Sequence, residues 1–393
     1  MKQLGFSAIC DWSARRKSAA FEEYRNTAGA LQTAQDPAWA GCTRRGPLAT
    51  GRAMSKPLLA GVVIPLLLSA QAAPEQFANP VLRWNFADPF ILSDGGRYFA
   101  FATNSGPLRV QVSSSDDLRS WVTPPREAMR KKPLWARSSQ PDIWAPEVIR
   151  AGGRYVMYFS AAAERATRPG AADPNRQCIG VATSRSPDRN FVPLGHPLIC
   201  AEFEEGVIDA SPFRDGKRLY LYYKTDGNCC GRATEIMVQE LTPSGLDLAS
   251  QPKSLGLSAE KPWEGGLLEA PTMIKKGGAY LLFYSANHYG DARYAVGYTR
   301  CDSPTGPCHD SQDVLLIQSS PGARPPLIGP GHQSIFEANG RTYIAYHAWK
   351  TTAEGGQDGC RAMHIDTLDW TAAGEPRVIP TLARAGSWSC PPP

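Results

Sequence analysis

The sequence predicts an all-β protein folded as a five-bladed β-propeller. A glycine-containing polar turn, a tyrosine and an apolar run rich in β-forming residues recur five times. The marker tyrosines are 57, 65, 60 and 63 residues apart, and self-similarity at a near-constant period is the signature of repeat architectures. Each turn lies between two β-rich runs, which predicts hairpins and not helical repeats. The markers are Tyr98, Tyr155, Tyr220, Tyr280 and Tyr343.

The N-terminal region is predicted to lie outside the propeller. Residues 54–72 combine a basic start, an apolar run too short to span a bilayer and a small-residue cleavage site before residue 73, which together indicate a secretory signal peptide. Residues 1–53 are Arg- and Ala-rich without periodicity, so we expect translation to start at Met54 and these residues to be a non-native extension. The alternative is a signal anchor with a short cytoplasmic tail. The expected location is secreted or periplasmic.

The remaining chain reads as five consecutive units within one catalytic domain, residues 79–393. No linker or low-complexity break interrupts it between residues 80 and 390, and the Pro-rich stretch 321–330 is expected to connect the fourth blade to the fifth. Five sheets of about four strands each fit a propeller, which builds its core blade by blade. The five turns begin at Gly95, Gly152, Asp215, Gly277 and Asn339.

The charge balance argues against nucleic-acid or membrane partners. Residues 1–72 contain nine Lys/Arg and four Asp/Glu, so that 33 residues of each sign remain in the rest of the chain. A net charge of zero implies no basic face.

Eight cysteines follow the predicted leader, and an even number in an exported chain suggests disulfides. Cys301 and Cys308 flank a turn-rich loop and form the safest pair. Cys178 with Cys200 and Cys360 with Cys390 are plausible pairs. The adjacent Cys229 and Cys230 either bond to each other or pair elsewhere. Neither the cysteines nor the histidines have the spacing of a zinc site.

The repeat also predicts which side chains face the central channel. Eleven residues before each marker tyrosine (ten in the first blade) lies a position that opens the innermost strand of its blade. Equivalent positions of different blades converge on the propeller axis. Three of the five are carboxylates, one is an aromatic ring and one is an imidazole: Asp88, Trp144, Asp209, Glu269 and His332.

The three carboxylates predict acid–base chemistry. Taken singly, Asp88 and Asp209 resemble turn-capping aspartates, but Glu269 lies in an apolar setting where glutamate is rarely found without a partner. Carboxyl groups that share a small cavity push their pKa values apart. One protonated and one ionised carboxyl group on either side of a bond is the requirement of a glycosidase. Glu147 is three residues out of this register, so we expect it to support the blade.

Aromatic side chains near the same rim fit a sugar substrate, because sugar faces stack on rings. The candidates are Trp84, Trp144 and Tyr289, of which Trp144 is in register with the carboxylates. His332 occupies the axial position of the fifth blade, where it could contact the ligand or a central ion.

In these segments the chain resembles glycoside hydrolase family 43, five-bladed propeller enzymes that act on arabinan and xylan. The resemblance runs from about Asn79 to the C-terminal tail and implies Asp88 as general base, Glu269 as general acid and Asp209 as the residue that tunes and orients the acid. It further implies a plant polysaccharide or oligosaccharide as the partner, and we expect a monomer. The reaction implied is hydrolysis with inversion, and the resemblance also implies a calcium or sodium ion on the axis that His332 faces, often through water. The matching segments are Ala-Asp88-Pro-Phe, Ile-Trp144-Ala-Pro-Glu, Ile-Asp209-Ala-Ser, Leu-Glu269-Ala-Pro and Gly-His332-Gln-Ser.

Three alternatives remain at this point. The β-xylosidase branch of the family commonly adds a C-terminal β-sandwich, for which this chain leaves no room, so arabinan is favoured over xylan. A non-catalytic sugar-binding propeller would lose the acid–base pair that Asp88 and Glu269 provide. A fructan-acting propeller uses an Arg-Asp-Pro segment, whereas this chain has Arg214-Asp215-Gly in a hairpin turn. The sequence does not distinguish endo from exo action.

Overall fold

The computed structural model describes residues 77–139, 142–164, 176–200, 203, 205–309, 314–323, 326–351 and 357–382. The predicted signal peptide and upstream extension lie outside these ranges, as does Cys390. Among the described residues, the one helix is the short 3-10 turn η2 (Gly227–Cys230). None of these residues forms a helix long and apolar enough to cross a membrane.

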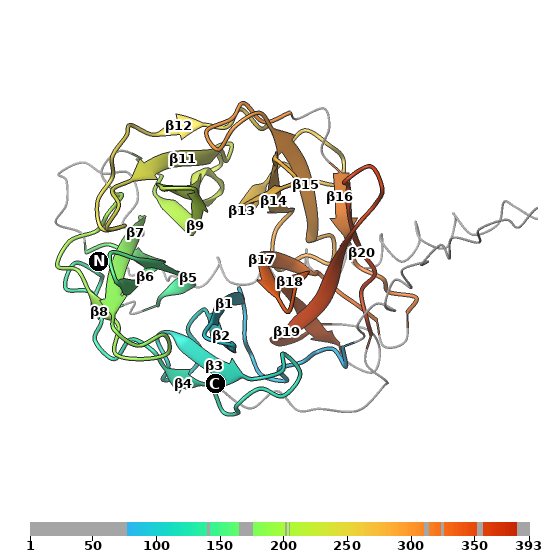
Figure 1. Ribbon diagram of the computed structural model, residues 1–393, viewed down its shortest axis with the longest axis horizontal. Helices are drawn as coiled ribbons and strands as arrows, with labels where there is room; N and C mark the ends of the chain where they lie inside the picture. Colours follow the sequence, from blue (N-terminus) through green and yellow to red (C-terminus); the bar gives the residue numbers. More distant parts are fainter. Residues whose placement is uncertain are drawn as a thin grey trace, which may run out of the picture. The chain divides into compact units, whose positions relative to one another are not determined.

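Five four-stranded antiparallel sheets surround a central axis, which confirms the predicted propeller (Figure 1). Each blade is one contiguous segment whose strands pair in sequence order, and the first strand of each blade is the innermost. The marker tyrosines all lie at or near the start of the second strands, just after the glycine turns. The blades are β1 (Phe90–Asp94), β2 (Arg97–Ala102), β3 (Gln111–Ser115) and β4 (Arg126–Glu127); β5 (Trp144–Ala151), β6 (Arg154–Ala162), β7 (Gln177–Ser184) and β8 (Val192–Pro193); β9 (Val207–Asp215), β10 (Arg218–Thr225), β11 (Ile236–Leu241) and β12 (Lys253–Ser254); β13 (Leu268–Lys276), β14 (Ala279–Ala286), β15 (Ala295–Cys301) and β16 (Val314–Ile317); β17 (Gly331–Ala338), β18 (Arg341–Thr351), β19 (Gln357–Trp370) and β20 (Pro376–Val378).

The hydrophobic core is divided into five clusters, one between each pair of neighbouring blades. Successive side chains of a strand point to opposite faces, so a second strand serves two clusters at once. On β6, Val156 and Tyr158 pack toward the third blade, whereas Met157 and Phe159 pack toward the first. Both faces of each blade are thus buried, which explains why the runs after the marker tyrosines are almost wholly apolar.

The ring closes where the segment before the first blade lies along β19 of the last blade. Val81 N–H donates to the Met363 carbonyl at 3.0 Å, and Phe86 N–H donates to the Arg361 carbonyl at 2.7 Å. The buried Asn79 side chain bonds both the N–H and the carbonyl of Ile365, at 2.9 Å each. These bonds bring Arg361 next to the first blade.

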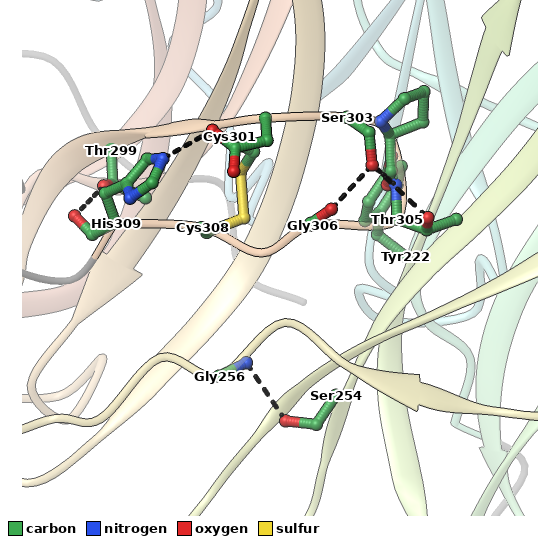
Figure 2. The surroundings of a disulfide bond; sticks show 12 residues. Tyr222, Ser254, Gly256, Thr299, Cys301, Ser303, Thr305, Gly306, Cys308 and His309 are labelled. Carbon is green, nitrogen blue, oxygen red and sulfur yellow. Dashed lines mark hydrogen bonds and ion pairs between the residues drawn. A yellow bond between two sulfur atoms is a disulfide. The ribbon is translucent and has the colours of Figure 1, made fainter.

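Three disulfides connect described cysteines. The bond between Cys301 and Cys308 closes the loop after β15, beside the hydrogen bond from Thr299 to the His309 carbonyl (Figure 2), and confirms the pair judged safest. Cys178 bonds Cys200, as predicted. The adjacent Cys229 and Cys230 bond to each other within η2. Cys360 is also disulfide-bonded.

Candidate active site

A left-handed residue marks the start of the innermost strand in every blade. The φ angle is positive, between 45° and 60°, at Asp88, Ala145, Asp209, Ala270 and His332. In the last four blades a break in the pairing of the first two strands falls at this position. Such a bulge bends the strand and re-aims its side chains. It therefore directs the predicted axial residues into one region. In blades 2 and 4 these axial residues are Trp144 and Glu269, each directly before the left-handed residue.

Hydrogen bonds between neighbouring blades hold these bulges. The backbone N–H of each left-handed residue donates to a side chain of the preceding blade, so that five bonds run around the ring. The bonds are Ala145 N to Thr103 Oγ1 (3.0 Å), Asp209 N to Ser160 Oγ (3.2 Å), Ala270 N to Asp209 Oδ2 (2.9 Å), His332 N to Ser285 Oγ (2.8 Å) and Asp88 N to His347 Nδ1 (3.1 Å).

Asp88 is surrounded by groups that favour its ionised form. Its Oδ1 accepts a hydrogen bond from Arg361 Nη1 at 3.1 Å and lies 3.4 Å from His332 Nδ1, while Thr103 donates its hydroxyl to Oδ2. Burial alone would raise the pKa of Asp88, but Arg361 and His332 outweigh it and hold the pKa well below the usual value. The carboxylate is therefore negative and ready to accept a proton.

The neutral imidazole ring of His347 accepts a hydrogen bond from the Asp88 backbone. Burial lowers the pKa of His347 to about 4. Its Nδ1 accepts the Asp88 N–H, so its 3.3 Å distance from Asp88 Oδ1 is not an ion pair. The ring stacks on Tyr294 with centroids 5.7 Å apart. Tyr294 in turn covers Gly331 so closely that a Cβ atom there would lie 2.0 Å from the tyrosine ring, which is why glycine precedes His332.

Asp209 and Glu269 form a second, buried carboxyl group pair. Burial raises the pKa of Asp209, and the charge of Glu269 adds to this rise. For Glu269 burial also opposes ionisation, yet Lys224 and the Tyr294 hydroxyl together lower its pKa below the usual value. Tyr294 donates to Glu269 Oε1 at 2.7 Å, and Lys224 Nζ lies 3.2 Å from Oε2. In this geometry the surroundings favour a proton on Asp209 and the ionised form of Glu269, although the family resemblance assigns the proton to Glu269.

Glu147 is a further buried carboxyl group, next to this pair on β5. Burial raises its pKa to about 8, so it is mostly protonated at neutral pH. It is 8% exposed and faces Ser211 and Asp209. This position fits the expected support of the blade.

The three predicted aromatic residues lie in different surroundings. Trp144 is half-buried at the start of β5, in register with the carboxylates. Tyr289 is 44% exposed at the rim, where the Arg361 guanidinium lies 4.8 Å from its ring centre. Trp84 lines a separate pocket with Arg119 and Trp121, and no carboxylate of the site lines that pocket. Sugar binding by these rings stays a prediction.

The donor set around His332 does not suit a directly coordinated cation. Calcium takes six to eight oxygen ligands, and the described residues contain no group of three or more His, Cys, Asp or Glu side chains that could hold a metal ion. Arg361 already occupies Asp88 Oδ1, and an arginine repels a cation. An axial ion would have to be held through water. It stays a prediction, and no step below depends on it.

A comparison with known families decides the identity. The model of the glycosyl hydrolases family 43 matches residues 77–376. The chain belongs to glycosyl hydrolase family 43.

The chain is similar to proteins that are described as acting on several sugars. The chain is 28% identical over 326 residues to a β-D-galactofuranosidase of Aspergillus niger, covering 79% of this chain and 86% of that one. It is 24% identical to an extracellular endo-α-(1→5)-L-arabinanase of Bacillus subtilis, covering 81% and 94% of the two chains. Among solved structures, a thermostable family-43 glycoside hydrolase is 26% identical with a TM-score of 0.65, covering 79% of this chain and 98% of that one.

Sequence reasoning missed four residues that contact the family 43 carboxylates. Lys224 and His347 occupy the second-strand position that pairs with the start of the innermost strand, as Ser160 and Ser285 do. Applying the repeat register to the second strands would have found them. Arg361 and Tyr294 gave no such signal. The missed residues are Lys224, Tyr294, His347 and Arg361.

Proposed function

We propose that this family 43 enzyme hydrolyses α-L-arabinofuranosyl linkages of arabinan-type plant polysaccharide or oligosaccharide, with inversion, outside the cytoplasm. One observation carries the proposal: the Asp88 carboxylate of the first blade interacts with a buried pair of carboxyl groups from the third and fourth blades, in which burial favours the retention of a proton. Arg361 keeps Asp88 ionised, whereas Asp209 and Glu269 both interact with the single ammonium group of Lys224. An inverting glycosidase needs one carboxylate and one carboxylic acid.

The proposed reaction uses the two sides of the site together, in a single displacement. Asp88 takes a proton from a water molecule, whose oxygen attacks the anomeric carbon. Glu269 gives its proton to the glycosidic oxygen as the bond to the anomeric carbon breaks. Asp88 ends protonated and Glu269 ionised, and exchange with solvent restores both. Asp209, whose Oδ2 is held by the Ala270 N–H beside Glu269, orients the acid and repels a second negative charge.

The substrate assignment rests on relatives whose names describe hydrolysis of linkages between sugars with five-membered rings. Besides the arabinanase, an extracellular exo-α-(1→5)-L-arabinofuranosidase of Cellvibrio japonicus is 23% identical over 319 residues. The galactofuranosidase at 28% identity supports a second candidate, a β-D-galactofuranoside, which is also a furanoside. A solved structure described as an endo-1,4-β-xylanase, 25% identical with a TM-score of 0.62, supports the xylan alternative.

Product analysis separates these substrates. The purified enzyme is incubated with linear arabinan, branched arabinan, arabinoxylan and an aryl β-D-galactofuranoside, and released sugars are followed by chromatography and by proton NMR of the first product. We expect arabinose or arabino-oligosaccharides whose anomeric configuration is opposite to that of the substrate. Release of galactose or xylose alone would replace the proposed substrate. A product with retained configuration would overturn the mechanism.

A further inference from the structure

One blade breaks the pattern of bonds that joins the others. In blades 2, 4 and 5 the second-strand position opposite the start of the innermost strand carries Ser160, Ser285 or His347, and each accepts the N–H of the next blade's left-handed residue. The same position in blade 3 is Lys224, which has no acceptor atom. Instead of Lys224, Asp209 accepts the hydrogen bond from the next blade, which comes from the Ala270 N–H. A position that departs from the ring's own pattern points to a role other than joining blades.

Lys224 lies between two carboxylates. Its side chain is 0% exposed, and its Nζ is 3.2 Å from Glu269 Oε2 and 3.6 Å from Asp226 Oδ1. Glu269 begins the neighbouring blade, whereas Asp226 directly follows β10; their side chains are 10% and 13% exposed. A small rotation of the flexible lysine side chain would bring the ammonium closer to Asp226 than to Glu269. A carboxylate would lie beside it in both positions.

The cluster around Lys224 has more carboxyl groups than cations. Asp209, Asp226 and Glu269 all interact with this single ammonium. Uncompensated buried negative charge is costly, so such a cluster retains a proton. Burial raises the pKa of Asp226 to about 6 despite Lys224. The position of the ammonium therefore decides which carboxyl group is ionised.

This geometry conflicts with the acid role unless Lys224 moves. While its ammonium contacts Glu269 Oε2, it favours the ionised form of Glu269, which cannot protonate a leaving group. The other groups that face Glu269 do not resolve this, because the Tyr294 hydroxyl and His332 both favour the anion, and only the carboxyl groups of Asp209 and Asp226 oppose it.

We propose that Lys224 is a positioning residue that shifts from Glu269 to Asp226 when a sugar occupies the site, and thereby places the proton of the Asp209–Glu269 pair on Glu269. The proton leaves Asp209 and binds the Glu269 oxygen that the ammonium has released, so no proton is gained or lost overall. This inference rests on the proposed role of Glu269 as general acid.

Two variants with opposite expected effects test the shift. The dependence of kcat/KM on pH is measured for Lys224→Met and Asp226→Asn with an arabino-oligosaccharide. Lys224→Met removes the charge that keeps Glu269 ionised, so the basic limb should move to higher pH. Asp226→Asn removes the second partner and leaves Lys224 on Glu269, so the basic limb should move to lower pH. A purely structural role would not move the limbs in opposite directions.

The leaving group provides an independent readout for Asp226→Asn. Its kcat on the oligosaccharide should fall at least about tenfold at neutral pH, the effect of a shift of one pKa unit, while an aryl arabinofuranoside with a good leaving group should be much less affected. Matched controls are Lys275→Met and Asp215→Asn, which break an ion pair of 2.9 Å at a hairpin turn outside the site. Neither control should move a limb.

Limbs that stay in place or move together in the two site variants would overturn the proposal. So would equal losses of Asp226→Asn on both substrates. The variant Glu269→Gln separates this failure from failure of the proposed function: if it spares the aryl substrate, Glu269 is the acid and only the lysine shift is wrong. If it does not, the assignment of the acid itself fails.

Discussion

At the scale of single residues, the environment gives chemically similar carboxyl groups different states. Asp88 has a guanidinium at 3.1 Å and is ionised. Asp209 and Glu269 share one ammonium, and burial penalises a second negative charge on them. Pairs of titratable groups whose surroundings push their pKa values apart are the usual basis for dividing acid and base roles.

The acid role of Glu269 predicts a dependence on the leaving group. Proton donation in the transition state contributes roughly 10²–10⁴-fold to the rate, so Glu269→Gln should lose about this much on arabino-oligosaccharides. The aryl group of an aryl arabinofuranoside leaves without needing protonation, so the hydrolysis of this substrate should be largely spared. Steady-state kinetics on both substrates check this. Asp88→Asn is the contrasting control, because loss of the base should slow both substrates alike.

Which site residues the sequence could predict depends on where they lie in the repeat. The tyrosine register located Asp88, Asp209, Glu269 and His332, since innermost strands begin at a nearly constant distance from the turn. Arg361 and Tyr294 reach the site from a third strand and from a loop, whose lengths differ between blades. Only the folded ring shows that they face the carboxylates.

At the scale of structural elements, each innermost strand begins with a conformation that its residues do not favour. A left-handed non-glycine residue costs on the order of 1 kcal/mol or more, and two of the five are alanines, Ala145 and Ala270. No local preference of alanine predicts this. The bonds from the preceding blade stabilise it, so the bulges follow from tertiary structure and could not be predicted from the segments themselves.

One of these bonds can be removed with a small change. Ser285 accepts the His332 N–H at 2.8 Å and donates to Gln333 Oε1 at 2.8 Å. Ser285→Ala leaves both groups buried and unpaired, which should lower the free energy of unfolding by about 1–3 kcal/mol. Urea denaturation measures this loss. The exposed Ser93→Ala on β1 should change stability by less than about 0.5 kcal/mol, and an equal loss in both variants would contradict the role of the bond.

At the scale of the whole molecule, the fold suits a protein that functions outside the cytoplasm. Disulfides join Cys178 to Cys200 and Cys301 to Cys308, and such bonds persist mainly in oxidising compartments. The relatives from Bacillus subtilis and Cellvibrio japonicus are described as extracellular. The five-bladed architecture itself could be predicted in full, because the repeat encodes it five times.

Export predicts a shortened mature chain. The signal-like features of residues 54–72 place cleavage near Ala73. N-terminal sequencing of protein secreted by the native host should therefore begin at or near Ala73. Mature protein that retains residues 1–50 would refute the predicted signal peptide.

The contact between Arg361 and Asp88 also links the proposed site to completion of the chain. Arg361 and Asp88 are 273 residues apart in sequence, and Arg361 lies in the last blade. In a chain that emerges from the ribosome, or from a secretion channel, Asp88 appears long before Arg361, whose guanidinium pairs with it in the folded protein. No nascent fragment that ends before the last blade has this pair. We therefore expect the proposed site, in which Arg361 pairs with Asp88, to form only when the ring is complete.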